Sequence, residues 1–134
     1  MTLYVDSSAL LKRYIDEPDS EAAVLILGSD PVLVTSWLTV VEVRRNLARL
    51  LDGVARLTTL RSAETDFDAM ALMVCDGATC TAAAVIGETL GVRSLDALHL
   101  ASAQRLMIDG LGFVTFDLRQ GQAARALGLR VLGC

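Results

Sequence analysis

The first residues of the chain constrain the fold most strongly, because a β-forming run is followed at once by an acid and then by a helical pattern. Leu3–Val5 is typical of a short buried strand. Asp6 stands where this strand ends, and Ser7 or Ser8 is suited to cap a helix that continues to Tyr14. The carboxyl ends of strands in an open parallel sheet line the ligand crevice. Asp6 is therefore either presented to a site or an ordinary helix cap.

Short apolar runs alternate with helical patterns along the rest of the chain. Strands are expected at Val32–Val34, Gly112–Thr115 and Arg130–Leu132, and Met70–Cys75 is either a helix end or a strand. The expected helices begin at Asp19 or Ser20, Trp37 (capped by Thr35 or Ser36), Leu57, Thr79 or Thr81, Leu95 (capped by Ser94) and Arg119. This alternation predicts a single three-layer α/β/α domain over residues 1–134, with a short central, mainly parallel sheet.

Composition limits the class of protein. The chain has 134 residues, of which 53% are hydrophobic, enough for one domain with a real core. Its uncharged runs fall well short of the roughly 20 apolar residues that a membrane span needs. Asp6 follows Met1 too closely for a secretory signal, so we expect a cytoplasmic protein. The three cysteines lack a C-x-x-C spacing, which indicates neither a disulfide framework nor a zinc site.

The net charge of −4 argues against a protein that coats nucleic acid, because such proteins are usually basic. It leaves open a nucleic-acid enzyme whose acidic site holds metal ions.

Four carboxylates stand apart from the acids in turns and on polar helix faces. Asp6 and Asp117 follow strands, Asp96 lies in the first turn of an apolar helix, and Glu42 interrupts the apolar stretch Trp37–Val43. One crevice at the strand ends can collect all four. Each also has a structural explanation: Asp96 and Asp117 suit helix N-termini, and Glu42 can pair with an arginine further along its helix.

Electrostatics decides what such a cluster needs. Two carboxylates about 5 Å apart repel by roughly 3 kcal/mol at an effective dielectric constant near 20. Four together would cost on the order of 10–20 kcal/mol, against a domain stability of about 5–15 kcal/mol. Protons, arginines or divalent cations must therefore neutralise the cluster. Oxygen ligands favour Mg²⁺ or Mn²⁺, and carboxylate-held Mg²⁺ serves phosphoryl transfer and phosphodiester hydrolysis.

Four segments together carry a recognisable pattern, and they are Val5–Leu10 (VDSSAL), Thr35–Val43 (TSxLTxxEV), Arg93–Ala103 (RSLDALHLASA) and Phe113–Asp117 (FVTFD). Their order and spacing resemble PIN-domain ribonucleases, and most closely the VapC toxins of prokaryotic toxin–antitoxin pairs. The resemblance covers essentially the whole chain.

The resemblance implies an Mg²⁺- or Mn²⁺-dependent endoribonuclease, a hydrolase that cuts tRNA or rRNA and leaves 5′-phosphate and 3′-hydroxyl ends. The family's acidic quartet falls on Asp6, Glu42, Asp96 and Asp117. The first, third and fourth of these would be the principal metal ligands, and Glu42 would hold a second metal or orient the attacking water. A VapB-type antitoxin and a homodimer are the implied protein partners.

Three further residues lie within the same motifs. Ser7 is a candidate hydrogen-bond donor beside the ligands. Thr115 stands near a position where some family members carry an additional acid, and its hydroxyl is suited to bind a metal-bound water. His99 follows Asp96 at Asp-x-x-His spacing, but its apolar neighbours favour a packing role.

Other functions remain as alternatives. The main one is a non-catalytic PIN-like module that binds RNA or protein. A receiver domain would want a lysine after a late strand, whereas the only lysine is Lys12 in the first helix. A dinucleotide-binding domain would need a G-x-G-x-x-G loop where Asp6-Ser7-Ser8 stands.

Overall fold

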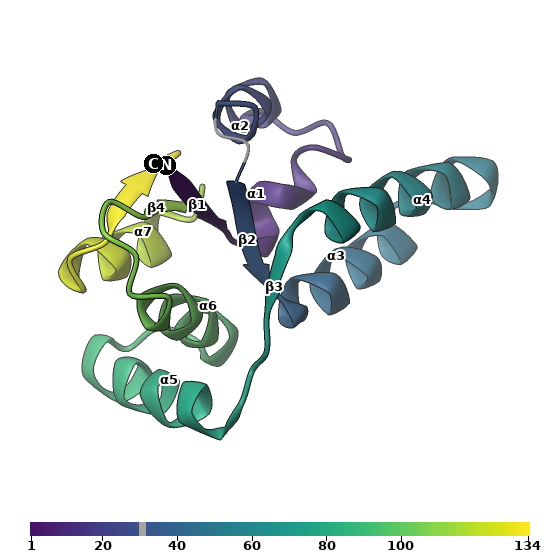
Figure 1. Ribbon diagram of the computed structural model, residues 1–134. Helices are drawn as coiled ribbons and strands as arrows, with labels where there is room; N and C mark the ends of the chain where they lie inside the picture. Colours follow the sequence, from purple (N-terminus) through teal and green to yellow (C-terminus); the bar gives the residue numbers. More distant parts are fainter. Residues whose placement is uncertain (30–31) are drawn as a thin grey trace.

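A five-stranded parallel sheet forms the centre of the computed structural model, which describes residues 1–29 and 32–134 (Figure 1). Its strand order is β3-β2-β1-β4-β5. The strands are β1 (Thr2–Val5), β2 (Val32–Ser36), β3 (Ala71–Met73), β4 (Gly112–Val114) and β5 (Arg130–Leu132). The helices are α1 (Ser7–Leu11), α2 (Ser20–Leu27), α3 (Trp37–Leu50), α4 (Gly53–Ala69), α5 (Gly77–Leu90), α6 (Ser94–Arg105) and α7 (Leu118–Ala126). The predicted α/β class and parallel sheet are confirmed.

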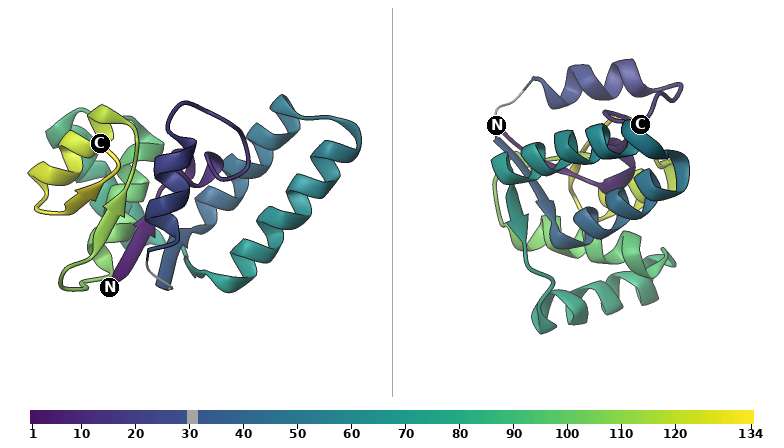
Figure 2. Two further views of the ribbon diagram at one scale, coloured as in Figure 1. Left: turned by 90° about the horizontal axis from the view of Figure 1, so that it is seen from above. Right: turned by 90° about the vertical axis from the view of Figure 1, so that its right-hand side faces the viewer.

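Two apolar clusters, one on each face of the sheet, hold the three layers together. Side chains alternate along β1, so that Leu3 and Val5 belong to the cluster under α1 to α4, and Tyr4 belongs to the cluster under α5, α6 and α7. Tyr4 stacks on Phe113 of β4, with 5.5 Å between ring centroids. In the right-hand view of Figure 2, α5 and α6 lie below the sheet and α2 lies above it. The left-hand view shows that α3 and α4 extend together away from the sheet.

The strand order creates the crevice in which the candidate site lies. From β1 the chain passes to β2 and β3 on one side, and it then crosses back through α5 and α6 to β4 on the other side. β1 and β4 are therefore neighbours at the point where the order reverses, with Val5 opposite Val114. In open α/β sheets, ligands bind outside the carboxyl ends of strands at such a switch point.

Two helices begin earlier than predicted because an acid rather than a hydroxyl residue forms the cap, whereas Ser36 caps α3 as predicted. Asp6 itself caps α1, with its Oδ1 accepting a hydrogen bond from the Ala9 amide at 2.8 Å. Asp76 caps α5 in the same way, through Thr79.

Two other boundaries also differ from expectation. Ser94 is the first residue of α6 rather than its cap, and α4 begins at Gly53 rather than Leu57. The ambiguous segment Met70–Cys75 contains β3, an edge strand whose pairing with β2 decides its conformation.

Within the part of the chain that the structure describes, no helix has both the length and the apolar character needed to span a membrane.

Gly133 lies against the backbone that carries the site. Its φ is +111°, and a Cβ at this position would stand 2.3 Å from the carbonyl oxygen of Thr115. We expect Gly133→Ala to lower the free energy of unfolding by about 1–3 kcal/mol, because the backbone must leave its present conformation. Urea unfolding measures the change. Gly77→Ala is the control, since Gly77 has open space and begins a helix; equal stabilities of the two variants would contradict the prediction.

Candidate active site

All four predicted carboxylates line one cavity of about 290 Å³ at the carboxyl end of the sheet. Asp6 comes from the end of β1, Glu42 from α3, Asp96 from the first turn of α6, and Asp117 from the N-cap of α7. The remaining wall residues are Ser7, Ser8, Leu11, Asn46 and Arg93. Four segments that are distant in sequence therefore deliver their acids to the same place.

Asp6 is the most buried of the four acids, at 3% exposure. Burial raises its pKa to about 6, although the nearby His99 and hydrogen bonds from Ala9, Ser8 and Thr115 act in the opposite direction. The Ser8 hydroxyl donates to Oδ2 at 2.8 Å. Asp6 is thus both the cap of α1 and a carboxylate that lacks enough positive charge around it.

Asp117 and Asp6 are linked through Thr115. The Asp117 amide donates to Thr115 Oγ1 at 3.1 Å, and this oxygen lies 3.2 Å from Asp6 Oδ2 and 2.7 Å from Gln120 Oε1. Asp117 Oδ1 caps α7 by accepting from the Gln120 amide at 2.9 Å. Since Thr115 is fully buried, it influences the cavity through these neighbouring acids.

Asp96 is half-buried and faces other acids. Its pKa is raised, first by burial and then by the negative charge of Asp117, with a smaller contribution from Glu42. The guanidinium of Arg93, whose Nε lies 3.6 Å from Asp96 Oδ2, lowers this pKa in part. The repulsion expected from the sequence is therefore present, at Asp96 and Asp117.

His99 is buried as predicted, but it also makes two hydrogen bonds that the sequence did not indicate. It is 1% exposed, as a packing role requires, but its Nε2 lies 2.6 Å from Glu42 Oε1 and its Nδ1 lies 2.8 Å from Tyr4 Oη. Glu42 thus pairs with His99, on another helix, and not with an arginine further along α3. Burial raises the pKa of Glu42, but the hydrogen bond with His99, with a smaller contribution from Ser7, leaves this pKa below its ordinary value.

The donor set fits a hard divalent cation. Four carboxylates in one cavity supply oxygen ligands of the kind that Mg²⁺ and Mn²⁺ take. In their present positions, however, the described residues include no group of three or more His, Cys, Asp or Glu side chains that could hold a metal ion. The contacts explain this, since Asp6 and Asp117 are engaged as caps and Asp96 faces Arg93.

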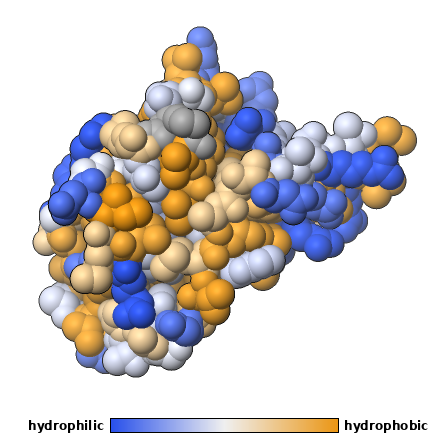
Figure 3. All heavy atoms as spheres, viewed as in Figure 1, coloured by the Kyte–Doolittle hydropathy of each residue, from blue (hydrophilic) through white to orange (hydrophobic). Residues whose placement is uncertain are grey.

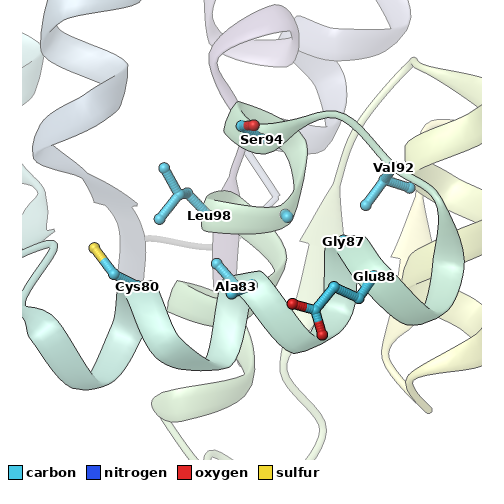
Figure 4. A pocket seen from close by; sticks show the side chains of 9 residues that line it. Cys80, Ala83, Gly87, Glu88, Val92, Ser94 and Leu98 are labelled. Carbon is cyan, nitrogen blue, oxygen red and sulfur yellow. The ribbon is translucent and has the colours of Figure 1, made fainter.

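A larger hollow, of about 570 Å³, lies between α5 and α6 and contains different chemistry (Figure 4). Cys80, Ala83 and Glu88 line it from α5, and Ser94 and Leu98 from α6. Glu88 is the only carboxylate in this wall. All three cysteines of the chain are free. This hollow is the larger of the two, but the smaller cavity is the better candidate for an active site because four acids converge on it.

Comparison with known proteins agrees with the geometry. Residues 3–126 match the PIN domain family. Ribonuclease VapC46 of Mycobacterium tuberculosis is 34% identical over 132 residues, which cover 97% of this chain and 95% of that protein.

Solved structures share the fold. FitAcB from Neisseria gonorrhoeae has a TM-score of 0.76 at 21% identity, covering 97% of this chain and 96% of the other. DNA-bound VapBC from Salmonella typhimurium has a TM-score of 0.72 at 18% identity, covering 100% and 99%. The chain therefore belongs to the PIN domain family. Within that family it is similar to the VapC ribonucleases.

The raised pKa of Asp6 predicts a pH-dependent stability. The folded protein binds this proton more tightly than the unfolded chain, so wild-type stability falls as the pH rises from about 4 to about 6. In EDTA at about pH 7.5, Asp6→Asn should raise the free energy of unfolding by about 1–3 kcal/mol, because asparagine removes the buried charge. The gain should vanish below about pH 4.

Urea titrations across this pH range measure the effect. Asp109→Asn, which removes an exposed acid near β4, controls for the loss of one negative charge. A difference between Asp6→Asn and wild type that did not vary with pH would contradict the assigned cause.

Proposed function

We propose that this protein is a divalent-metal-dependent endoribonuclease, the toxin of a toxin–antitoxin pair, and that Asp6, Glu42, Asp96 and Asp117 form its active site. The observation that carries the proposal is the convergence of these four acids on one cavity at the switch point of the sheet. Similarity to VapC46 over nearly the whole chain supports RNA as the substrate. We take residues 1–134 as a single PIN domain acting in the cytoplasm, where tRNA and rRNA are found.

The four acids have different tasks in this proposal. Asp6, Asp96 and Asp117 would hold Mg²⁺ or Mn²⁺, and Glu42 would hold a second ion or orient the attacking water. Bound divalent ions activate water and stabilise the leaving oxygen of a phosphodiester. Ser7 lines the cavity beside Glu42 and lowers the pKa of its carboxylate. Thr115 supports Asp6 and Asp117 through its hydrogen bonds from within the core.

The electrostatics of the site favour cation binding. Burial raises the pKa of Asp6 and of Asp96, and the negative charges of Asp117 and Glu42 raise that of Asp96 further, which means that the metal-free site is short of positive charge. The nearest arginine, Arg93, has an 81% exposed side chain and so neutralises Asp96 only in part. A divalent ion would relieve the remaining repulsion between the carboxylates, and this relief would favour binding of the ion.

One observation favours the alternative of a non-catalytic module that binds RNA or protein. The acids are not pre-arranged around an ion, and two of them have structural duties as helix caps. A scaffold domain, however, has no need for four acids in one cavity, so the nuclease is the better-supported function.

Cleavage of total RNA by the purified protein tests the proposal. With Mg²⁺ or Mn²⁺ we expect discrete fragments carrying 5′-phosphates, and none with EDTA. Asp96→Asn should lower the cleavage rate by at least about 100-fold, because loss of residues that only support metal ligands already costs about 10–100-fold.

Asp109→Asn is the matched control and should cleave like wild type, since this acid is exposed and outside the cavity. Metal-independent cleavage, or full activity in Asp96→Asn, would refute the assigned site. Absence of cleavage from a folded, antitoxin-free protein would favour the binding module.

The proposed protein partners are a VapB-type antitoxin and a second copy of the chain. The VapBC structure that shares this fold supports the antitoxin. For the homodimer, Trp37 and Val41 are one turn apart on α3 and are 53% and 66% exposed. Figure 3 shows apolar side chains gathered on the body of the molecule, while the projecting end of the α3–α4 pair is mostly hydrophilic in that view. Exposed apolar surface of this kind marks interaction sites.

We expect light scattering to show a dimer for the wild type. Trp37→Glu should weaken the dimer by about 30-fold or more, because buried tryptophans are frequent interface hot spots. Glutamate is compatible with the first turn of α3, so the fold should survive. Val54→Glu places the same charge in the first turn of α4, on another exposed apolar residue, and should leave the dimer intact. Equal effects of the two changes would argue against this interface.

A further inference from the structure

We propose that Tyr4 and His99 form a buried relay that fixes the orientation of the Glu42 carboxylate at the mouth of the acidic cavity. His99 is then a positioning residue, and Tyr4 positions His99. The inference rests on the proposed function, because it assigns a purpose to the orientation of Glu42. It concerns residues on three elements: Tyr4 on β1, Glu42 on α3 and His99 on α6.

The relay runs through the core and ends at the site. Tyr4 is fully buried and His99 nearly so, while Glu42 lines the cavity and is only partly exposed. The two bonds measure 2.8 Å from Tyr4 Oη to His99 Nδ1 and 2.6 Å from His99 Nε2 to Glu42 Oε1. Both ring nitrogens of His99 are therefore used, one towards the core and one towards the cavity.

Chemistry fixes the direction of the bonds. An ionised carboxylate only accepts hydrogen bonds, so His99 Nε2 must carry a proton and donate a hydrogen bond to Glu42. In a neutral imidazole the other nitrogen is then an acceptor, and the Tyr4 hydroxyl donates to Nδ1. Burial raises the pKa of Tyr4, which keeps this hydroxyl protonated. Tyr4 thereby selects the tautomer that Glu42 needs.

The position of the ring is also fixed by packing. Tyr4 meets His99 edge to face, with ring centroids 6.0 Å apart, and Tyr4 is itself stacked on Phe113. The donor to Glu42 is therefore part of the rigid core, in contrast to a flexible surface arginine. With Oε1 held by His99, the second oxygen of Glu42 is left for whatever the cavity binds. Hydrogen bonds that orient a ligand in this way are typical of metal sites.

Two substitutions at His99 separate the relay from simple packing. His99→Leu keeps an apolar side chain of similar bulk but removes the donor, and we expect Mn²⁺ affinity by calorimetry and kcat for RNA each to fall by about 10–100-fold. His99→Gln keeps an N–H that can reach Glu42, and it should restore most of both losses. KM for RNA should change little, because Tyr4 and His99 are buried and cannot contact the RNA themselves.

Tyr4→Phe tests the other end of the relay. It removes only the hydroxyl that selects the tautomer, and it should weaken Mn²⁺ binding in the same direction as His99→Leu. Tyr14→Phe is the matched control, because Tyr14 also donates to a carboxylate, Asp66, at 2.6 Å but lies outside the acidic cavity. Circular dichroism and thermal unfolding confirm that each variant is folded.

Nitrogen NMR gives a readout that needs no metal. The chain contains one histidine, so protein labelled with ¹⁵N-histidine and free of an affinity tag yields the signals of His99 alone. We expect a proton on Nε2 in the wild type, and loss of the single preferred tautomer in Tyr4→Phe. An unprotonated Nε2 would overturn the relay outright.

The outcomes distinguish this inference from the proposed function. Normal Mn²⁺ binding and cleavage in the wild type, with equal values in His99→Leu and His99→Gln, would overturn the relay and leave the nuclease intact. A wild type that neither binds Mn²⁺ nor cuts RNA would overturn the proposed function. In that case the NMR result alone decides whether Tyr4 and His99 orient Glu42.

Discussion

Burial of the Asp6 carboxylate is the constraint on which the site depends. The same side chain follows β1, caps α1 and lines the acidic cavity. Its hydrogen bonds to Ala9, Ser8 and Thr115 hold it firmly, yet burial still raises its pKa. The fold therefore contains a carboxylate that protein groups orient but do not neutralise. A carboxylate that is held in place but not neutralised is suited to bind a cation from solution.

The other acids are built into the structure in the same manner. Asp117 caps α7 and is joined to Asp6 through Thr115, and Asp96 lies in the first turn of α6, where the helix dipole favours a negative charge. Helix N-termini thus position three of the four acids. Glu42 lies within a helix instead, and a histidine from the opposite helical layer orients it. An acid can cap a helix with one carboxylate oxygen and still offer the other to a metal ion, because a carboxylate has two oxygens.

The arrangement also explains why four acids do not form a preformed ion cage in this structure. Without a cation, each carboxylate gains more by facing a protein donor than by facing another carboxylate. Asp96 faces Arg93, Glu42 faces His99, and Asp6 faces amide and hydroxyl donors. The four acids nevertheless line the same cavity.

The sequence by itself determined the α/β class, the parallel sheet, most element positions and the four acids, because strand and helix periodicity and strand-end acids are local patterns. It left open whether Asp6 or a serine caps α1, and it did not determine the cap at Asp76, the strand β3 or the role of His99. The two helix caps depend on which side-chain oxygen reaches the free backbone amides at the start of the helix, and β3 depends on pairing with β2. The partners of His99 lie 57 and 95 residues away in the chain. Only the packing of α6 against β1 and α3 decides that its two nitrogens meet Tyr4 and Glu42, because hydrogen bonding between distant segments leaves no periodic signal in the sequence.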